Sequence, residues 1–307
     1  MQLPKYLPFA DGKWQLNMGV KPLDLATLIE IDDKFEYELL LKEKLLADRY
    51  PDVFAALPGS EPSQQEVLEV IIAHLQQYFP QYYQWSEEAI ACPRTGQVWK
   101  FADFAHAPLD LAGRILQEDL VIMESSPDGY ILTAASECFR LRWNLQEKMG
   151  QPLAKIHSPV PGYDKKLQHP MDNLFAKIQV QHPIWRMNWS IVDDPVMLLE
   201  PSNSTLELDP RITTDNAGET LWLRMERQCL RRLPQTGAII FFTHTYVDPL
   251  SILRQIPGAA TALISTIELM PKEMQNYKNL LPIRQALLSY LEKIAEGEKN
   301  KVTSASL

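Results

Sequence analysis

Cysteine is scarce in this 307-residue chain, and long apolar runs are absent. The three cysteines, Cys92, Cys138 and Cys229, are too scattered for a disulfide framework and cannot supply the four thiolates of an iron–sulfur cluster. No stretch approaches the roughly 18 apolar residues that span a bilayer. The first residues also lack the basic start and apolar stretch of a signal peptide. We therefore expect a cytoplasmic protein with reduced cysteines and no membrane contact.

Concentrated positive charge is missing as well. The formal net charge is -9 and there is no block of lysines and arginines, so we expect no nucleic-acid partner. The motifs GxGxxG, GxxxxGK[ST], HExxH, GxSxG and CxxC do not occur, which argues against the common nucleotide-binding, zinc-protease and hydrolase classes. Because CxxCH is also absent, any haem would be held non-covalently.

The hydrophobic pattern divides the chain into four segments. Residues 1–118 are predicted to form an N-terminal arm and a helical section, with helical periodicity at 24–46 and 64–79. Residues 119–247 are predicted to form the core, because β-type runs occur at 119–124, 130–135, 184–192, 221–233 and 238–247. Helices are expected at 248–297, followed by a disordered tail at 298–307.

Two strands, a helical insert at 144–181 and three further strands follow the order of a PAS domain. The predicted fold class is therefore α+β, with a PAS-like five-stranded antiparallel sheet, an N-terminal helical section and C-terminal helices. PAS sheets often hold haem or flavin between the sheet and the intervening helices, so a ligand is expected at the insert. Fold analogy alone does not establish one.

Within the insert, His157 lies in the segment PLAKIHSPVPGY, which contains three prolines and a glycine. Rigid loops position functional groups well. An axial haem ligand needs a neutral imidazole nitrogen that points into an apolar pocket. A capping or turn histidine is the plainer interpretation, and His169 and His182, each before a proline, are alternative ligands.

Alternation along the strands sorts further candidates by face. In the run 184–192, Arg186 and Asn188 share one face while Trp189 lies on the other. In the run 221–233, Arg224 and Glu226 share a face. This pair could form an internal ion network, or it could contact a substrate and haem propionates.

The last strand brings His244 and Tyr246 to a common face. If that face points inward, His244 could touch a ligand. A cross-strand hydrogen bond is the alternative.

Several motifs in fixed order carry a resemblance to a known family. They are LPFADG, MGVKPLDLATLIEIDD, ALPGS, EVLEVIIAHL, IHSPVPGY, WRMNWSIVDDP, ERQCLRRLPQTGAI and TYVDPL, and together they cover most of residues 7–285. The chain thus resembles the haem-dependent oxidative N-demethylase α-subunit family, also described as dimethylamine monooxygenase haem subunits.

The resemblance implies a PAS-like core that binds haem b, with His157 as the iron ligand. It also implies O2-dependent removal of an N-methyl group from a small amine, with electrons from flavin and iron–sulfur partner subunits. The predicted catalytic residues are Glu226 and His244, and the predicted cofactor contacts are His157, Arg186, Asn188, Trp189, Arg224 and Tyr246.

The chain departs from the family pattern at two places. Relatives commonly have an arginine where this chain has His244, and a Pro-Ser pair near Arg140-Leu141, so the distal pocket would differ if either position lines it. A haem-based sensor or binding protein without monooxygenase activity is the alternative function, and a module that has lost its pocket is a third.

Overall fold

The computed structural model describes residues 3–201 and 207–305, and its centre is an antiparallel sheet of seven strands. Their spatial order is β1-β8-β9-β10-β6-β7-β2. The strands are β1 (Lys21–Pro22), β2 (Phe54–Ala56), β6 (Asp119–Ser126), β7 (Gly129–Ser136), β8 (Ile184–Val192), β9 (Trp222–Arg232) and β10 (Ile239–Pro249). A second, three-stranded sheet is made by β3 (Gln84–Trp85), β4 (Ala89–Cys92) and β5 (Gln97–Lys100).

The five predicted strands are the five central strands of the main sheet, and the α+β class is confirmed. The expected total of five strands was wrong, because β1 and β2 extend the sheet at its two edges. These edge strands have two and three residues, which is too short for alternation to reveal them. The small sheet was also missed, since its strands have only two to four residues.

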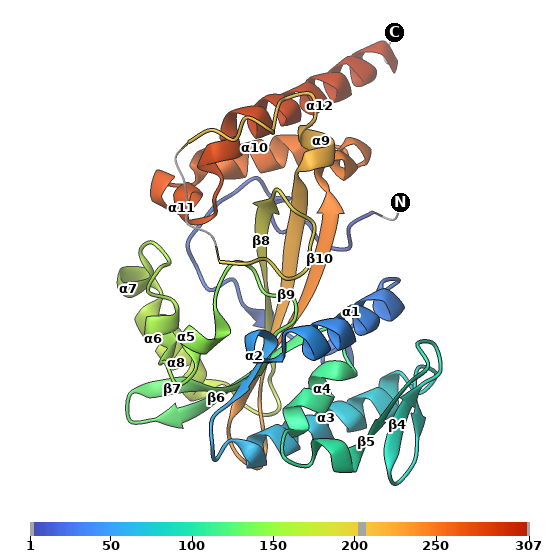
Figure 1. Ribbon diagram of the computed structural model, residues 1–307. Coiled ribbons are helices and arrows are strands. Elements are labelled where there is room, and N and C mark those ends of the chain that lie inside the picture. Colours follow the sequence, from blue (N-terminus) through green and yellow to red (C-terminus); the bar gives the residue numbers. More distant parts are fainter. Residues whose placement is uncertain (1–2, 202–206, 306–307) are drawn as a thin grey trace.

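Helices surround the main sheet in three groups (Figure 1). The first group is α1 (Phe35–Asp48), α2 (Tyr50–Val53), α3 (Glu61–Tyr78) and α4 (Pro108–Arg114). The insert between β7 and β8 holds α5 (Leu145–Lys148), α6 (Leu153–Ile156), α7 (Tyr163–Lys166) and α8 (Gln168–Lys177). The third group is α10 (Ala259–Leu269), α11 (Lys272–Tyr277) and α12 (Arg284–Ala305), which lie with the short α9 (Ala217–Thr220) across one end of β8, β9 and β10.

Short 3-10 helices lie at Leu25–Thr27, Phe101–Phe104, Leu250–Gln255 and Leu281–Ile283. The helix expected at 24–46 therefore begins later, at Phe35, after one such turn. The tail expected from residue 298 is helical up to Ala305, and residues 306–307 lie outside the described residues. Among the described residues, no helix combines the length and the apolar character needed to cross a membrane.

The strand register assigns each side chain to one of two faces, because residues directly opposite in antiparallel strands share a face. One face carries Arg186, which pairs in register with Gln228 and through it with Thr243. The insert packs on this face, where Leu153 and Phe175 join Leu230 in one apolar cluster. We call it the insert face.

The other side of the sheet, which we call the front face, packs against the first group of helices. Cys229, Ile240 and Phe242 of β9 and β10 share an apolar cluster with Leu39 of α1 and Ile71 of α3. Leu230 and Cys229, neighbours in β9 that point to opposite faces, therefore lie in different apolar clusters, whereas Val247 of the insert face joins the cluster of the front face.

Helix α4 approaches the front face so closely that Gly113 leaves no room for a side chain. A Cβ placed there would lie 2.1 Å from Oγ of Ser136 on β7 and 2.8 Å from its Cβ. We predict that Gly113→Ala lowers the free energy of unfolding by about 1–3 kcal/mol, because the helix must shift from the sheet. Urea denaturation followed by tryptophan fluorescence measures this.

Ser136→Gly in the same chain should restore part of the loss, since it removes both clashing atoms. The matched control is Gly297→Ala in α12, where a Cβ meets nothing within 4 Å, and which should be neutral or stabilising by up to about 1 kcal/mol. A Gly113→Ala variant as stable as the wild type would contradict the close contact.

Candidate functional site

His157 lies directly after α6, and the backbone fixes the orientation of its ring. Its main-chain N–H donates to the carbonyl oxygen of Leu153 over 3.1 Å. Nδ1 of the imidazole donates to the same oxygen over 3.0 Å. A carbonyl can only accept, so Nδ1 carries the proton and Nε2 of the neutral ring keeps its lone pair. No residue that the structure describes forms a hydrogen bond with this Nε2.

The surroundings of the ring keep it neutral. Burial lowers the pKa of His157, and the positive charges of Arg186 and Lys148 act in the same direction against the hydrogen bond to Leu153. The ring stacks on Tyr163, with centroids 5.0 Å apart and planes 11° from parallel. A neutral, oriented imidazole with one nitrogen tied to a carbonyl is the arrangement that metal-binding histidines require.

The proline-rich segment after His157 folds back to place Tyr163 under the ring. Val160 donates its N–H to the carbonyl of His157 over 2.9 Å, and Tyr163 donates its N–H to Val160 over 3.1 Å. Gly162 between them has φ of 77°, a left-handed conformation that favours glycine. The local sequence thus explains both the loop and the stacked ring.

Next to the insert, part of the insert face remains incompletely covered. Three adjacent strands contribute six partly exposed side chains there: Ile184, Arg186, Asn188, Gln228, Phe241 and Thr243. One face of an antiparallel sheet is commonly solvated, so exposure alone does not mark a site. This patch is a candidate place for a bound group because it contains Arg186, whose charge acts on the ring of His157.

Glu226 lies at the border of this patch and is held by amides. Its Oε2 accepts hydrogen bonds from Asn188 over 3.2 Å and from Gln228 over 3.1 Å. Its Oε1 lies 3.6 Å from Nε of Arg224. The carboxylate is thus engaged on both oxygens, as expected for a buried charge that must be compensated.

Arg224 is one of the largest fully buried side chains of the molecule. Its guanidinium donates to the carbonyl oxygens of Met197, over 3.1 Å, and of Phe139. These contacts bind β9 to two loop segments far away in the sequence. The geometry therefore indicates a structural role, although Arg224 lies on the insert face with the other candidates.

Lys278, directly after α11, contacts Asn188, which also binds Glu226. The sequence analysis did not identify this lysine. Its ammonium donates to the carbonyl of Trp189 over 2.6 Å and to Oδ1 of Asn188 over 3.4 Å. Burial lowers its pKa to about 8, although the charge of Glu226 opposes this. In the sequence MQNYKNL nothing distinguishes Lys278 from an exposed lysine.

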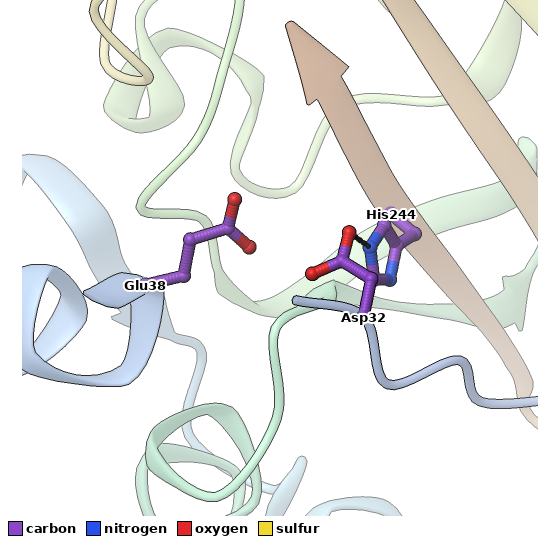
Figure 2. A group of neighbouring side chains, drawn as sticks. All are labelled: Asp32, Glu38 and His244. Atoms are coloured by element: carbon purple, nitrogen blue, oxygen red, sulfur yellow. Dashed lines mark hydrogen bonds and ion pairs between the residues drawn. The ribbon is translucent and has the colours of Figure 1, made fainter. Parts of the chain in front are cut away.

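His244 and Tyr246 lie on the front face, away from the insert. The imidazole of His244 is buried between two carboxylates, with Nδ1 3.1 Å from Glu118 and Nε2 3.3 Å from Asp32. Figure 2 shows the carboxylate of Asp32 against the imidazole and Glu38 pointing toward both from α1. Tyr246 donates its hydroxyl hydrogen to Glu30 of the N-terminal segment and stacks on His244.

The charges around His244 form a buried ion group. Burial alone would lower the pKa of His244, but Glu118 and Asp32 outweigh it and raise the pKa to about 10. The pKa of Asp32 falls to about 2, because hydrogen bonds from His244 and Gln117 outweigh its burial. Burial raises the pKa of Glu38 to about 7.

Asp32, Glu38 and His244 could each offer one ligand atom to a metal ion, and these atoms lie within 4.8 Å of one another. However, both ring nitrogens of His244 already face carboxylates. A doubly protonated imidazolium satisfies both contacts and has no lone pair left for a metal. His244, Asp32 and Glu118 therefore form a complete group of charges, which we call the ion triad.

The structure thus divides the sequence-predicted residues between two places. Arg186, Asn188, Arg224 and Glu226 lie on the insert face, which His157 approaches from the insert. Trp189, His244 and Tyr246 lie on the front face, where Trp189 packs edge-on against Phe9. Sequence alternation predicted which residues share a face, but it could not tell which face meets the insert.

A comparison with protein families matches residues 19–288 to the model described as haem-dependent oxidative N-demethylase, alpha subunit-like. The chain belongs to this family. The resemblance seen in the motifs is thereby confirmed.

The match runs from just before β1 into α12 and so includes the whole main sheet and the insert. Because the family is described as haem-dependent, haem is the group that the site would have to fit. Three observations fit it: a free Nε2 on His157, an open patch beside the insert, and an arginine there, Arg186, whose buried Nε has no hydrogen-bond partner among the described residues.

The ion triad on the front face predicts a specific pH dependence of stability. His244→Gln should lower the free energy of unfolding by about 3–5 kcal/mol at pH 6, because it leaves buried carboxylates without their cation. A folded pKa of about 10, against an ordinary value of 6.5, means that this contribution is complete below about pH 6.5 and is lost as the pH rises toward 10.

The difference in melting temperature between wild type and His244→Gln should therefore shrink between pH 6 and pH 9.5. His106→Gln, at an exposed histidine, is the matched control and should show no difference at either pH. A gap that stays constant over this range would show that His244 is not held as an imidazolium.

Proposed function

We propose that this chain is the haem subunit of an O2-dependent oxidative N-demethylase that acts on a small methylated amine. The observation that carries the proposal is the free, oriented Nε2 of His157 beside the open part of the insert face. Haem b would be held between the insert and the sheet, and Nε2 of His157 would bind its iron. Attachment would be non-covalent, since the chain has no CxxCH motif.

The order of the strands and helices supports a PAS-like core and this placement. The five central strands occur along the chain as a pair, β6 and β7, and a trio, β8 to β10, and the four short helices of the insert separate the two sets. The insert covers part of one face of the antiparallel sheet, near β6 and β7 (Figure 1), and PAS helices likewise pack on one face. In this interpretation β1 and β2 are additions at the edges.

Bound haem would supply the activation of O2 and the oxidation of the N-methyl carbon. The chain's own residues would prepare the place. Leu153 holds the tautomer of His157, and the apolar residues of the insert exclude water from that side of the site. Glu226, fixed by Asn188 and Gln228 and compensated by Arg224, would act on the amine as a positioned hydrogen-bond acceptor.

We assign the front-face candidates a different role. His244 and Tyr246 bind the acidic side chains Asp32 and Glu30 and so fasten the N-terminal segment to β10. They stabilise the sheet on its front face, opposite to the insert, and do not contact the cofactor in this proposal. Trp189 likewise packs with the N-terminal arm through Phe9.

Electrons would come from flavin and iron–sulfur partner subunits in the cytoplasm. All three cysteines are buried, and burial raises the pKa values of Cys138 and Cys229 to about 12. Such thiols are poor nucleophiles and poor metal ligands. In this proposal the cysteines hold no redox centre, and the reducing equivalents come from the partner subunits.

Haem uptake tests the ligand directly. Purified wild-type protein reconstituted with haemin should show a strong Soret band, and His157→Ala should lose or shift it because the axial bond is removed. Added imidazole should restore a histidine-type spectrum in the variant. His169→Ala, at an exposed histidine of the same insert, should behave as wild type; if it alone changes the spectrum, the ligand assignment is wrong.

Formaldehyde production separates the enzyme from a haem sensor. The reduced, haem-loaded protein with dimethylamine, O2 and a competent reductase should release formaldehyde in proportion to the amine consumed. If the haem is reduced and reoxidised but no formaldehyde forms with any of a panel of small methylated amines, the result would favour the alternative function, a haem-based sensor or binding protein.

A further inference from the structure

The insert face carries four cations, and three of them are satisfied within the chain. Arg224 donates to carbonyl oxygens and lies beside Glu226, and Lys278 donates to Trp189 and Asn188. Arg232 donates to the carbonyl of Ile178 over 2.7 Å, to that of Gly237 over 2.7 Å and to the hydroxyl of Tyr130 over 3.0 Å. These three hold elements of the fold together.

Arg186 is the fourth cation, and it differs from the others. Among the described residues it forms no hydrogen bond or salt bridge with any of its nitrogens. The Nε of Arg224 is also buried without a hydrogen bond, but the two other nitrogens of Arg224 donate to carbonyl oxygens. Glu226 lies two residue pairs further along the ladder, on the same face and opposite Asn188, and its charge acts on Arg186. Its Oε2 is occupied by Asn188 and Gln228, and its Oε1 faces Arg224.

An unpaired guanidinium that is partly withdrawn from water destabilises the folded chain. The charge cannot be removed by loss of a proton, because arginine stays protonated in proteins. The sequence nevertheless places this arginine in the open patch, in the row formed with Gln228 and Thr243. Its field also reaches the ring of His157. An anion from outside the chain could form the direct pair that Glu226, whose charge acts on Arg186 without a hydrogen bond, does not form.

The shape of the side chain selects the anion. A guanidinium presents two parallel N–H groups, which match the two oxygens of a carboxylate in a bidentate pair. We propose that Arg186 binds a carboxylate in the site beside His157. This inference rests on the proposed function, because it takes that site to be the haem site.

Two sources can supply this carboxylate, a haem propionate or a substrate that carries a carboxylate beside its methylated nitrogen. A propionate would make Arg186 an anchor of the cofactor. A substrate carboxylate would extend the substrate class to N-methyl amino acids, whose nitrogen would face Glu226.

Haem titrations separate the two sources. Wild type, Arg186→Met and Arg186→Lys are titrated with haemin and with haemin dimethyl ester, in which both propionates are esterified. For a propionate partner, Arg186→Met should bind haemin at least about tenfold more weakly than wild type, since a charge-assisted bidentate pair is lost. Both proteins should bind the ester equally, and Arg186→Lys should lie between.

If the partner is a substrate carboxylate, Arg186→Met should bind haemin as tightly as wild type does. The two proteins should then differ in a second titration, in which an amine is added to the haem-loaded protein. N-methylglycine should then perturb the Soret spectrum of the haem-loaded wild type at lower concentration than dimethylamine does, and Arg186→Met should remove this preference. Arg211→Met, at an exposed arginine far along the chain, is the control in both titrations.

The stability of the haem-free proteins checks that Arg186 is not a structural residue. Removal of an unpaired cation should leave the melting temperature of Arg186→Met equal to or above that of wild type. A lowered melting temperature, or a variant that matches wild type with haemin and with N-methylglycine, would overturn the inference. If the wild type itself takes up no haem, the proposed function falls together with it.

Discussion

One hydrogen bond, from Nδ1 of His157 to the carbonyl oxygen of Leu153, determines what the insert can do. It fixes the tautomer and the orientation of the imidazole, and it leaves Nε2 as a base with a free lone pair. The short helix α6, the left-handed Gly162 and the stacked Tyr163 all serve to hold this geometry. In the proposed function, this nitrogen is the group that would bind iron beside the open patch.

Two cations of the sheet are compensated to different degrees. On the front face, His244 lies between Glu118 and Asp32, so each nitrogen of the ring has a carboxylate. On the insert face, Arg186 forms no hydrogen bond or salt bridge with a described residue, and only the more distant charge of Glu226 acts on it. The first arrangement stabilises the fold, and the second is the basis for the proposed carboxylate site.

The sequence predicted the long strands well because alternation and β-branched or aromatic residues mark them directly. β8 was predicted with the bounds that it has in the structure, and the faces of Arg186, Asn188 and Trp189 followed from it. The short edge strands could not be predicted, because Lys21–Pro22 and Phe54–Ala56 are strands only through their neighbours. Helix α12 continues past the predicted start of the tail for reasons that local composition does not reveal.

Side-chain partners far apart in the sequence were the hardest part of the site to predict. His244 meets Asp32 across 212 positions and Glu118 across 126, and no local motif signals either contact. Lys278 reaches Asn188 only because α11 packs beside β8. The candidate ligand His157 was predictable because its proline-rich loop is itself local.

A crystal structure of the haem-loaded protein tests the central claim most directly. The account predicts iron bonded to Nε2 of His157, with Nδ1 still donating to Leu153 and the porphyrin lying against the insert face. Iron bonded to another side chain, or a porphyrin on the front face beside His244, would contradict it.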